Sequence, residues 1–214
     1  DPKKLLEKPS GYFRFLLNEF CRLALALGGV HVNVTGLEKV PRDGRFLLVS
    51  NHRFAFDPLV FYSSMPWADL AFLSKKENFS IFVVAQIMRE VLCLPLDREN
   101  DRAAAKTIIE ASRLLKSGKV SVGLFPEGYT SKTCELLPFR NGAFKVAYRA
   151  EAPIAVCVIN NTRSIPKELF WRRTEIKLNV LEVIPYEDYK DMHTVELGDK
   201  IHDMMLSELE KLRA

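Results

Sequence analysis

Short, nearly continuous apolar runs are the feature that most limits how this chain can fold. Four of them contain few polar residues: RFLLV at 45–49, LAFL at 70–73, VSVGLF at 120–125 and IAVCVI at 154–159. A strand with one solvated face would alternate apolar and polar side chains, so unbroken runs indicate strands that are buried on both faces. The runs therefore predict a sheet that is covered by helices on both sides.

The rest of the chain completes this pattern. Further strands are expected at 30–34, 91–96 and 176–184, and helices from Pro58, over 102–116, over 142–150 and in the C-terminal tail. With 214 residues and 48% hydrophobic composition, the chain can bury one large core, and it has no repeat or linker that would divide it. We predict a single α/β domain over 30–214, with a largely buried parallel or mixed sheet flanked by helices.

Residues 11–30 predict a helix with two different faces. Arg14, Asn18 and Arg22 recur every four residues, and apolar side chains fill the other face. These polar residues make the window a poor transmembrane span. The apolar face could pack on the domain's own core or lie in a bilayer interface, and the sequence leaves both open. We assign residues 1–29 as an N-terminal amphipathic, membrane-associating helix.

Charge and cysteine content limit the classes of partner. Lys and Arg outnumber Asp and Glu by 31 to 27, a net charge of +4, which falls short of the strong basic signature of many nucleic-acid binders. A mild attraction to anionic lipid or phosphate fits this charge. The four cysteines lie far apart, without the close pairs of metal knuckles. We therefore expect no nucleic-acid partner and no metal site.

The segment SNHRFAFDP at 50–58 carries the first candidate for chemistry. In one regular helix His52 and Asp57 would lie about 140° apart and could not meet. If a strand ends near Ser50 and a helix starts at Asp57-Pro58, the loop between them can fold the carboxylate back onto the imidazole. The alternative is that Asp57 only caps the helix and that His52 is a hydrogen-bonded residue at the strand end.

Two further strand ends carry groups that suit an anionic ligand. The segment LPLDREN at 94–100 supplies Arg98, whose planar guanidinium can bind phosphate with two hydrogen bonds. The segment FPEGYTSK at 125–132 supplies an acid, a glycine that permits close backbone approach, two hydroxyls and a positive charge: Glu127, Gly128, Thr130, Ser131 and Lys132. Ligands collect at the carboxyl ends of strands in α/β sheets, so we expect these segments to share one site.

Taken together, these segments resemble the glycerolipid acyltransferase family. NHRFAFD is similar to that family's N-H-x4-D block, LPLDREN to its arginine-bearing second block, FPEGYTSK to its F-P-E-G block and EAPIAVCVI to its proline-bearing fourth block. The four blocks occur in order and, with the flanking GLEKVP, cover about residues 36–160. One such block would be weak evidence, whereas four in order are strong.

The resemblance implies an activity and a set of roles. His52 would be the general base, Asp57 would orient it, Arg98 would bind the acceptor's phosphate, and Glu127 and Gly128 would shape the acceptor site. The reaction would move a fatty acyl group from acyl-CoA or acyl-carrier protein to the sn-2 hydroxyl of lysophosphatidic acid, giving phosphatidic acid. It needs no cofactor beyond this co-substrate. An apolar groove would hold an acyl chain, and the protein would bind peripherally to the cytoplasmic face of the cell membrane.

Departures from the family pattern bear on the acceptor. The chain has Tyr129-Thr130 where the F-P-E-G block usually continues with Thr-Arg, so Lys132 or Arg140 would have to replace that arginine. The alternatives are another lysophospholipid or an amino-acid lipid as acceptor, and a non-catalytic lipid-binding module. A metal hydrolase with His52, Asp57 and Glu127 as ligands is a further alternative, although the sequence lacks a helical histidine pair.

Overall fold

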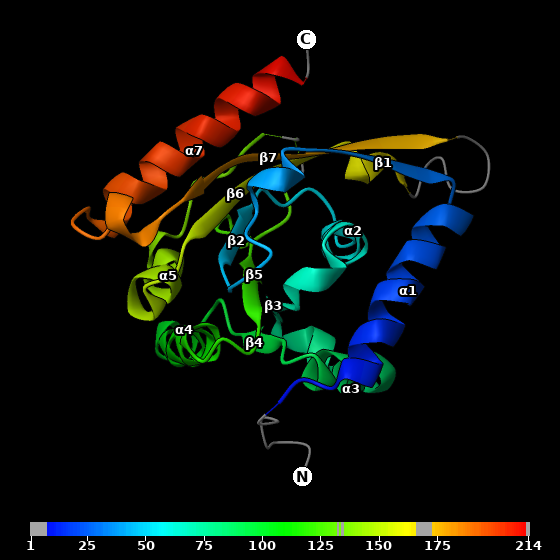
Figure 1. The fold of residues 1–214 in the computed structure, drawn as a ribbon, viewed down its shortest axis with the longest axis horizontal. Coiled ribbons are helices and arrows are strands. Elements are labelled where there is room, and N and C mark those ends of the chain that lie inside the picture. The colour runs from blue at the N-terminus through cyan, green and yellow to red at the C-terminus, as the bar shows by residue number, and fades with distance from the viewer. Residues whose placement is uncertain (1–7, 132, 134, 166–172, 213–214) are drawn as a thin grey trace.

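A seven-stranded sheet forms the centre of the molecule (Figure 1). The structure is a computed structural model that describes residues 8–131, 133, 135–165 and 173–212. Along the sheet the strand order is β1-β7-β6-β2-β5-β3-β4. The bounds of the strands are β1 Val30–Thr35, β2 Leu47–Ser50, β3 Leu70–Lys75, β4 Leu94–Leu96, β5 Ser121–Leu124, β6 Ile154–Asn160 and β7 Thr174–Ile184.

The sheet is mixed, and its parallel part contains the apolar runs. Strands β4, β3, β5, β2 and β6 pair in parallel, whereas β7 runs antiparallel to β6 and parallel to β1. Every residue of β2 and β5 is buried, whereas β7 alternates between buried and more exposed positions over most of its length. The prediction of a largely buried sheet in a single α/β domain is therefore confirmed.

Helices cover both faces of this sheet, as Figure 1 shows. On one face lie α4 (Asp101–Lys116), α5 (Lys145–Ala150) and α7 (Thr194–Lys211), whose buried side chains share a core with β2, β5 and β6. On the other lie α1 (Gly11–Leu27) and α2 (Asp57–Ser64), and α3 (Phe82–Glu90) packs beside them. The two cores lie on opposite faces of the sheet, because successive residues of a strand point to opposite faces.

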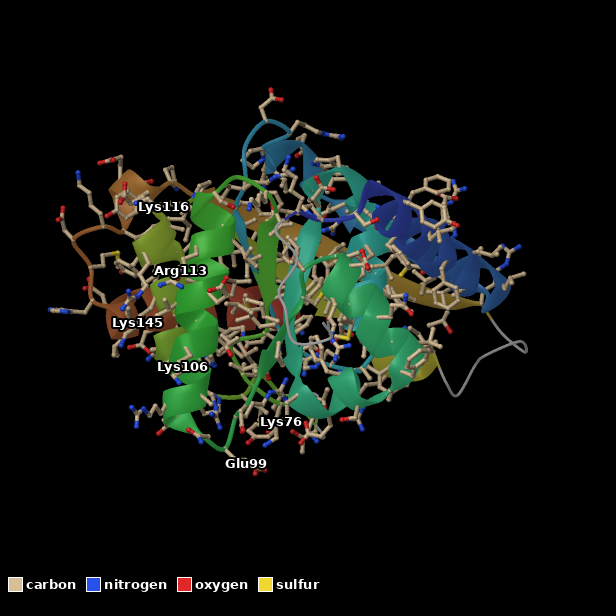
Figure 2. All side chains as sticks on the ribbon, turned by 90° about the horizontal axis from the view of Figure 1, so that it is seen from below. Lys76, Glu99, Lys106, Arg113, Lys116 and Lys145 are labelled. Atoms are coloured by element: carbon tan, nitrogen blue, oxygen red, sulfur yellow. The ribbon has the colours of Figure 1, made fainter. Side chains whose placement is uncertain are left out.

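The outer surface of α4 and α5 is strongly charged. Figure 2 shows Lys106, Arg113, Lys116 and Lys145 extending away from the sheet. The ammonium of Lys116 lies 2.8 Å from the carboxylate of Glu151, an ion pair in solvent. Because the opposite side of α4 packs into the core, the amphipathic helix expected at 102–116 is confirmed.

The sequence predicted that Arg14 lies on the polar face of α1, and this prediction is wrong. This arginine is buried and donates hydrogen bonds to the backbone oxygens of Leu70 and, at 3.0 Å, Val91. Both Nη atoms are therefore hydrogen-bonded inside the domain, and Nε lies 3.5 Å from the carboxylate of Asp69. Helical spacing alone could not show this, because a four-residue repeat marks one face of a helix without saying which side faces water.

With Arg14 turned inward, the apolar face of α1 is left partly in solvent. Cys21 and Leu25 pack into the core, but five large side chains of this helix are more than half exposed: Tyr12, Phe15, Phe20, Leu23 and Leu27. One side of this helix therefore packs on the domain's own core, and the other side is left exposed. Among the residues described, no helix is both long enough and apolar enough to span a membrane.

Strand β4 is shorter than expected. The predicted strand was 91–96, but residues 91–93 end α3 in a turn in which Leu92 has a φ of +63°. A left-handed residue cannot continue a strand, so only Leu94–Leu96 pair with β3. The shortened strand still ends two residues before Arg98, which keeps that side chain at the carboxyl edge of the sheet.

Candidate active site

His52 and Asp57 form a buried pair at the carboxyl end of β2. The imidazole Nδ1 lies 2.8 Å from the Asp57 carboxylate Oδ2, and the Asp57 side chain is fully buried. A neutral imidazole donates from Nδ1 to this carboxylate, which leaves the lone pair of Nε2 for a substrate. The Nε2 atom makes no hydrogen bond within the described part of the chain. The expected meeting of the two side chains is confirmed.

Asp57 does not cap the helix that it begins. The residue at the N-cap of α2 is Phe56, and no side chain caps this helix end. Instead, Asp57 Oδ2 accepts hydrogen bonds from the backbone N–H groups of Arg53, at 2.6 Å, and Phe54, at 2.9 Å. These donors fix the carboxylate against the loop, so its orientation toward His52 does not depend on the imidazole alone.

Aromatic rings support the other side of the imidazole. The ring of Phe125 stacks on His52 with centroids 4.2 Å apart and an interplanar angle of 12°. Phe72 in turn stacks on Phe125, with ring centroids 5.5 Å apart. Gly123 makes room for this stack, because a Cβ there would come within 2.5 Å of the Phe72 ring. No sequence signal singled out Phe125 for this role, since one phenylalanine at a strand end is most often a core residue.

Glu127 and Ser131 hold the backbone of His52. The Glu127 carboxylate accepts the N–H of His52 through Oε1 at 2.6 Å and the N–H of Leu137 through Oε2 at 2.8 Å. Ser131 donates its N–H to the carbonyl of His52 at 3.1 Å. Burial raises the pKa of Glu127 above its ordinary value, against these donors, which lower it. Both carboxylate oxygens accept backbone N–H groups, so they are not turned toward His52 and Asp57 as shared metal ligands.

Asn51 ties this loop to the neighbouring strand β6. Its side-chain Nδ2 donates to the carbonyl of Ile159 at 2.9 Å, and its Oδ1 accepts the N–H of Ile159 at 2.8 Å. The amide thus continues the pairing between β2 and β6 by one step beyond Ser50. The sequence analysis gave Asn51 no role, although its place beside His52 was a signal.

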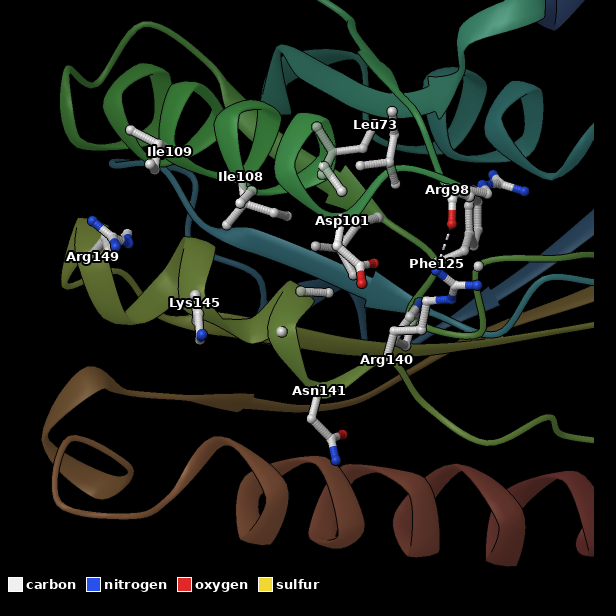
Figure 3. A pocket seen from close by; sticks show the side chains of 18 residues that line it. Leu73, Arg98, Asp101, Ile108, Ile109, Phe125, Arg140, Asn141, Lys145 and Arg149 are labelled. Atoms are coloured by element: carbon white, nitrogen blue, oxygen red, sulfur yellow. Dashed lines mark hydrogen bonds between the residues drawn. The ribbon is translucent and has the colours of Figure 1, made fainter.

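Arg98 and Gly128 lie at one end of a groove between α4 and α5. The groove has a volume of about 520 Å³, and its lining is mostly apolar, with Arg98, Asp101, Arg140, Lys145 and Arg149 as its charged residues. Figure 3 shows Arg98, Phe125 and Arg140 at one end, with Ile108, Ile109 and Arg149 toward the other. Phe125 thus contacts both the groove and His52.

The remaining residues that the sequence predicted to bind a ligand have a less defined place in the site. Thr130 is exposed on the loop after β5. The hydroxyl of Ser131 is buried and has no hydrogen-bond partner in the described part of the chain. Lys132 lies outside the described residues. Among the residues that the structure does describe, no three His, Cys, Asp or Glu side chains cluster as a metal would require.

Comparison with known proteins adds to this geometry. A family model described as acyltransferase matches residues 31–160. The 1-acyl-sn-glycerol-3-phosphate acyltransferase of Borreliella burgdorferi is 24% identical over 93% of this chain and 80% of its own length. The protein of the same name from Bacillus subtilis is 29% identical over 83% of this chain and 87% of its own length. Animal relatives are longer, and the chain spans 63% to 64% of them.

A solved structure shares the fold. The crystal structure of the 1-acyl-sn-glycerophosphate (LPA) acyltransferase PlsC from Thermotoga maritima superposes with a TM-score of 0.78 at 24% sequence identity. The match covers 95% of this chain and 80% of that one. The family model spans more than half of the chain and includes both β2 and β5, with the loops that hold His52 and Glu127. The chain belongs to the acyltransferase family.

Proposed function

We propose that this protein transfers a fatty acyl group from an acyl thioester to the sn-2 hydroxyl of lysophosphatidic acid, giving phosphatidic acid. The donor is acyl-CoA or acyl-carrier protein. The relatives' names support the acceptor. The observation that carries the chemistry is the His52–Asp57 pair, in which a fully buried carboxylate holds Nδ1 at 2.8 Å and leaves Nε2 free.

Such a pair suits direct attack by the lipid hydroxyl. Nε2 takes the hydroxyl proton as the oxygen bonds to the thioester carbonyl carbon, and the imidazolium that forms is stabilised by Asp57. Collapse of the tetrahedral intermediate breaks the carbon–sulfur bond, and the thiolate takes the proton back from His52. Base catalysis of this kind contributes about a hundredfold to ten-thousandfold, and positioning supplies much of the rest.

The groove between α4 and α5 is our candidate for an acyl chain. Its walls are formed by aliphatic side chains of α4, such as Ala105, Ile108 and Ile109, and by Leu73 and Leu124 of the sheet. Burial of apolar surface there would contribute about 0.8 kcal/mol for each CH₂ group. The groove ends at Phe125, so a chain bound in it would have its head group beside His52.

We further propose that α1 and α3 dock on the bilayer that supplies the acceptor. Phe20 of α1 is 64% exposed, Phe82 of α3 is 82% exposed, and the neighbours Ile81 and Val83 are also exposed. The two helices are in contact, and the N–H of Ser10 donates to the carbonyl of Glu90 where they meet. Clustered exposed apolar residues of this kind indicate a membrane or partner surface.

The cytoplasmic face of the membrane is the side we propose. Cys21, Cys93 and Cys157 are buried free thiols, which favours a reducing compartment. Residues 1–29, of which 8–29 are described, would form the segment of the protein that associates with the membrane.

The activity is tested by following free thiol in a mixture of purified protein, acyl-CoA and lysophosphatidic acid. We expect release that requires the acceptor and that falls by at least about a hundredfold in His52→Ala. The matched control is His31→Ala, because His31 is exposed on β1. Thiol release without acceptor, or equal release by His52→Ala, would contradict the proposal.

Acceptor and donor are separated in the same assay. Lysophosphatidic acid is compared with lysophosphatidylcholine and with an amino-acid lipid, and acyl-CoA with acyl-carrier protein. A preference for one of the other acceptors would support acyl transfer and contradict lysophosphatidic acid as the acceptor. Liposome binding without thiol release from either donor would instead identify a non-catalytic lipid-binding module.

Membrane docking is tested by co-sedimentation with anionic vesicles. We expect Phe20→Asp and Phe82→Asp each to weaken binding, since a buried phenylalanine contributes about 2 kcal/mol. Val195→Asp is the control, because Val195 is 55% exposed on α7, across the sheet from α1. Equal losses in all three variants would show that this surface is not the docking site.

A further inference from the structure

Two arginines from different loops lie against the same tyrosine ring near the active site. The guanidinium carbon of Arg98 lies 5.4 Å from the centroid of the Tyr129 ring, and that of Arg140 lies 5.3 Å from it. Arg140 Nη1 also donates to the backbone carbonyl of Arg98 at 3.0 Å, and Nη2 lies 3.4 Å from the Tyr129 hydroxyl. Figure 3 shows both arginines at the same end of the groove, next to Phe125.

Gly128 is what allows Arg140 to reach this position. A Cβ on Gly128 would come within 3.1 Å of both Cδ and Nε of Arg140, which is tighter than nearly all contacts of this kind. The φ of Gly128 is +75°, a conformation that glycine adopts readily. The sequence suggested that Gly128 admits a ligand. In the structure its open side is filled by the stem of Arg140.

The two arginines carry positive charge without a directly paired carboxylate among the described residues, although the charge of Glu77 acts on Arg98. Within the stretches of chain that the structure describes, neither guanidinium makes an ion pair with a carboxylate, and Asp101 in the groove lining pairs with neither. Arg98 Nε is buried and has no hydrogen-bond partner there. Burial lowers the pKa of Arg98, and the charge of Arg140 adds to this, against the charges of Tyr129 and Glu77, which raise it. Two adjoining cations without a counter-ion are a place for a bound anion.

The loop that carries Tyr129 also holds the catalytic histidine. Glu127, two residues before it, accepts the N–H of His52, and Ser131, two residues after it, donates to the carbonyl of His52. An anion on the two arginines would lie at the end of the groove next to Phe125, whose ring stacks on His52. In lysophosphatidic acid only a short glycerol segment separates the phosphate from the reacting hydroxyl, which matches this arrangement.

We propose that Arg98 and Arg140, spaced by Tyr129, together bind a phosphate monoester, and that Arg140 determines the preference for an acceptor with a terminal phosphate. The inference rests on the proposed function. Two guanidinium groups suit a monoester with two negative charges better than a phosphodiester with one. Arg140 thus supplies, from a separate loop, the charge that the chain lacks at Thr130.

Steady-state kinetics with lysophosphatidic acid tests the role of Arg140. Loss of a hydrogen bond to a charged partner predicts that Arg140→Gln raises KM by about tenfold to a hundredfold, with kcat changed by less than about threefold. Arg140→Lys, which keeps charge without the planar fork, should lie between. Arg42→Gln is the matched control, because Arg42 also stacks on an aromatic ring, Trp67, in a loop before β2. An unchanged KM in Arg140→Gln, or a fall in kcat alone, would overturn the proposal.

Binding of the head group alone separates this proposal from the activity. At constant ionic strength, glycerol 3-phosphate should raise the Tm of the wild type. The increase should be smaller for Arg140→Gln and Arg98→Gln, and as large as in the wild type for Arg42→Gln. A shift in the wild type without acyl transfer would contradict the proposed function and keep the phosphate site. Acyl transfer to lysophosphatidic acid with equal Tm shifts in wild type and Arg140→Gln would support the proposed function and contradict the role of Arg140 in the phosphate site.

Discussion

The side-chain amide of Asn51, the residue before His52, exchanges two hydrogen bonds with the backbone of Ile159. Donor and acceptor lie 2.9 Å and 2.8 Å apart in the two bonds, and Asn51 is fully buried. The pairing extends the β2–β6 ladder past Ser50 and fixes where the chain turns out of the sheet. His52 therefore starts its loop from a rigid point.

Asn51→Asp tests this attachment. The new carboxylate would face the carbonyl of Ile159 in place of a donor, without water to screen it. We expect the free energy of unfolding to fall by about 2–4 kcal/mol in urea denaturation. Asn33→Asp, on exposed β1, should change it by less than about 0.5 kcal/mol. Equal stability of Asn51→Asp and wild type would refute the attachment.

Asp57→Asn tests whether His52 needs the negative charge of the Asp57 carboxylate in addition to being oriented by it. The asparagine oxygen can still accept from the Arg53 and Phe54 N–H groups, but it no longer stabilises an imidazolium at His52. We expect kcat to fall by about a hundredfold to ten-thousandfold, with a cooperative thermal transition retained. Thiol release and thermal melting measure the two effects. Asp188→Asn, at an exposed position, serves as control, and a kcat within tenfold of wild type would show that the carboxylate charge is not needed.

The buried carboxyl of Glu127 predicts an unusual dependence of stability on pH. Burial raises its pKa in the folded protein above 4.5, the ordinary value. Between these two pKa values the folded state holds a proton that the unfolded chain has released, so the free energy of unfolding falls as pH rises through this window. Most acidic groups that are paired in the folded state act in the opposite direction.

Glu127→Gln removes this titration. We expect the stability of wild type minus that of the variant to decline as pH rises from about 4.5 and then to level off above the folded pKa. The variant should also lose about 1 kcal/mol at all pH values, because its amide offers one oxygen to the N–H groups of His52 and Leu137. A difference that is flat or rises with pH would be incompatible with a raised pKa.

Arg14→Met tests whether the inward arginine attaches α1 to the domain. The change leaves the carbonyls of Leu70 and Val91 without these donors and keeps the apolar stem. We expect a loss of about 2–4 kcal/mol in stability and faster proteolysis within α1. Arg22→Met, on the exposed side of the same helix, is the control. Similar behaviour of both variants would mean that packing alone holds the helix.

Much of the fold could be predicted from local patterns. The runs at 45–49, 120–125 and 154–159 are apolar on both faces, and their short length favours a buried strand over a helix. The helix boundary near Asp57-Pro58 likewise follows from the preference of proline for the first turn of a helix. These signals depend on neighbours in the chain, so the sequence contains them in full.

What the sequence by itself determined was where most strands and helices lie, although not α3 or the start of β4, and that His52 and Asp57 flank a turn at a strand end. Only the tertiary structure decided that β2 and β5 are neighbours, so that Glu127 meets the backbone of His52. The same holds for Arg140, which reaches Arg98 because Gly128 leaves space. Strand order and long side-chain contacts depend on how the whole core packs, and no local periodicity records that.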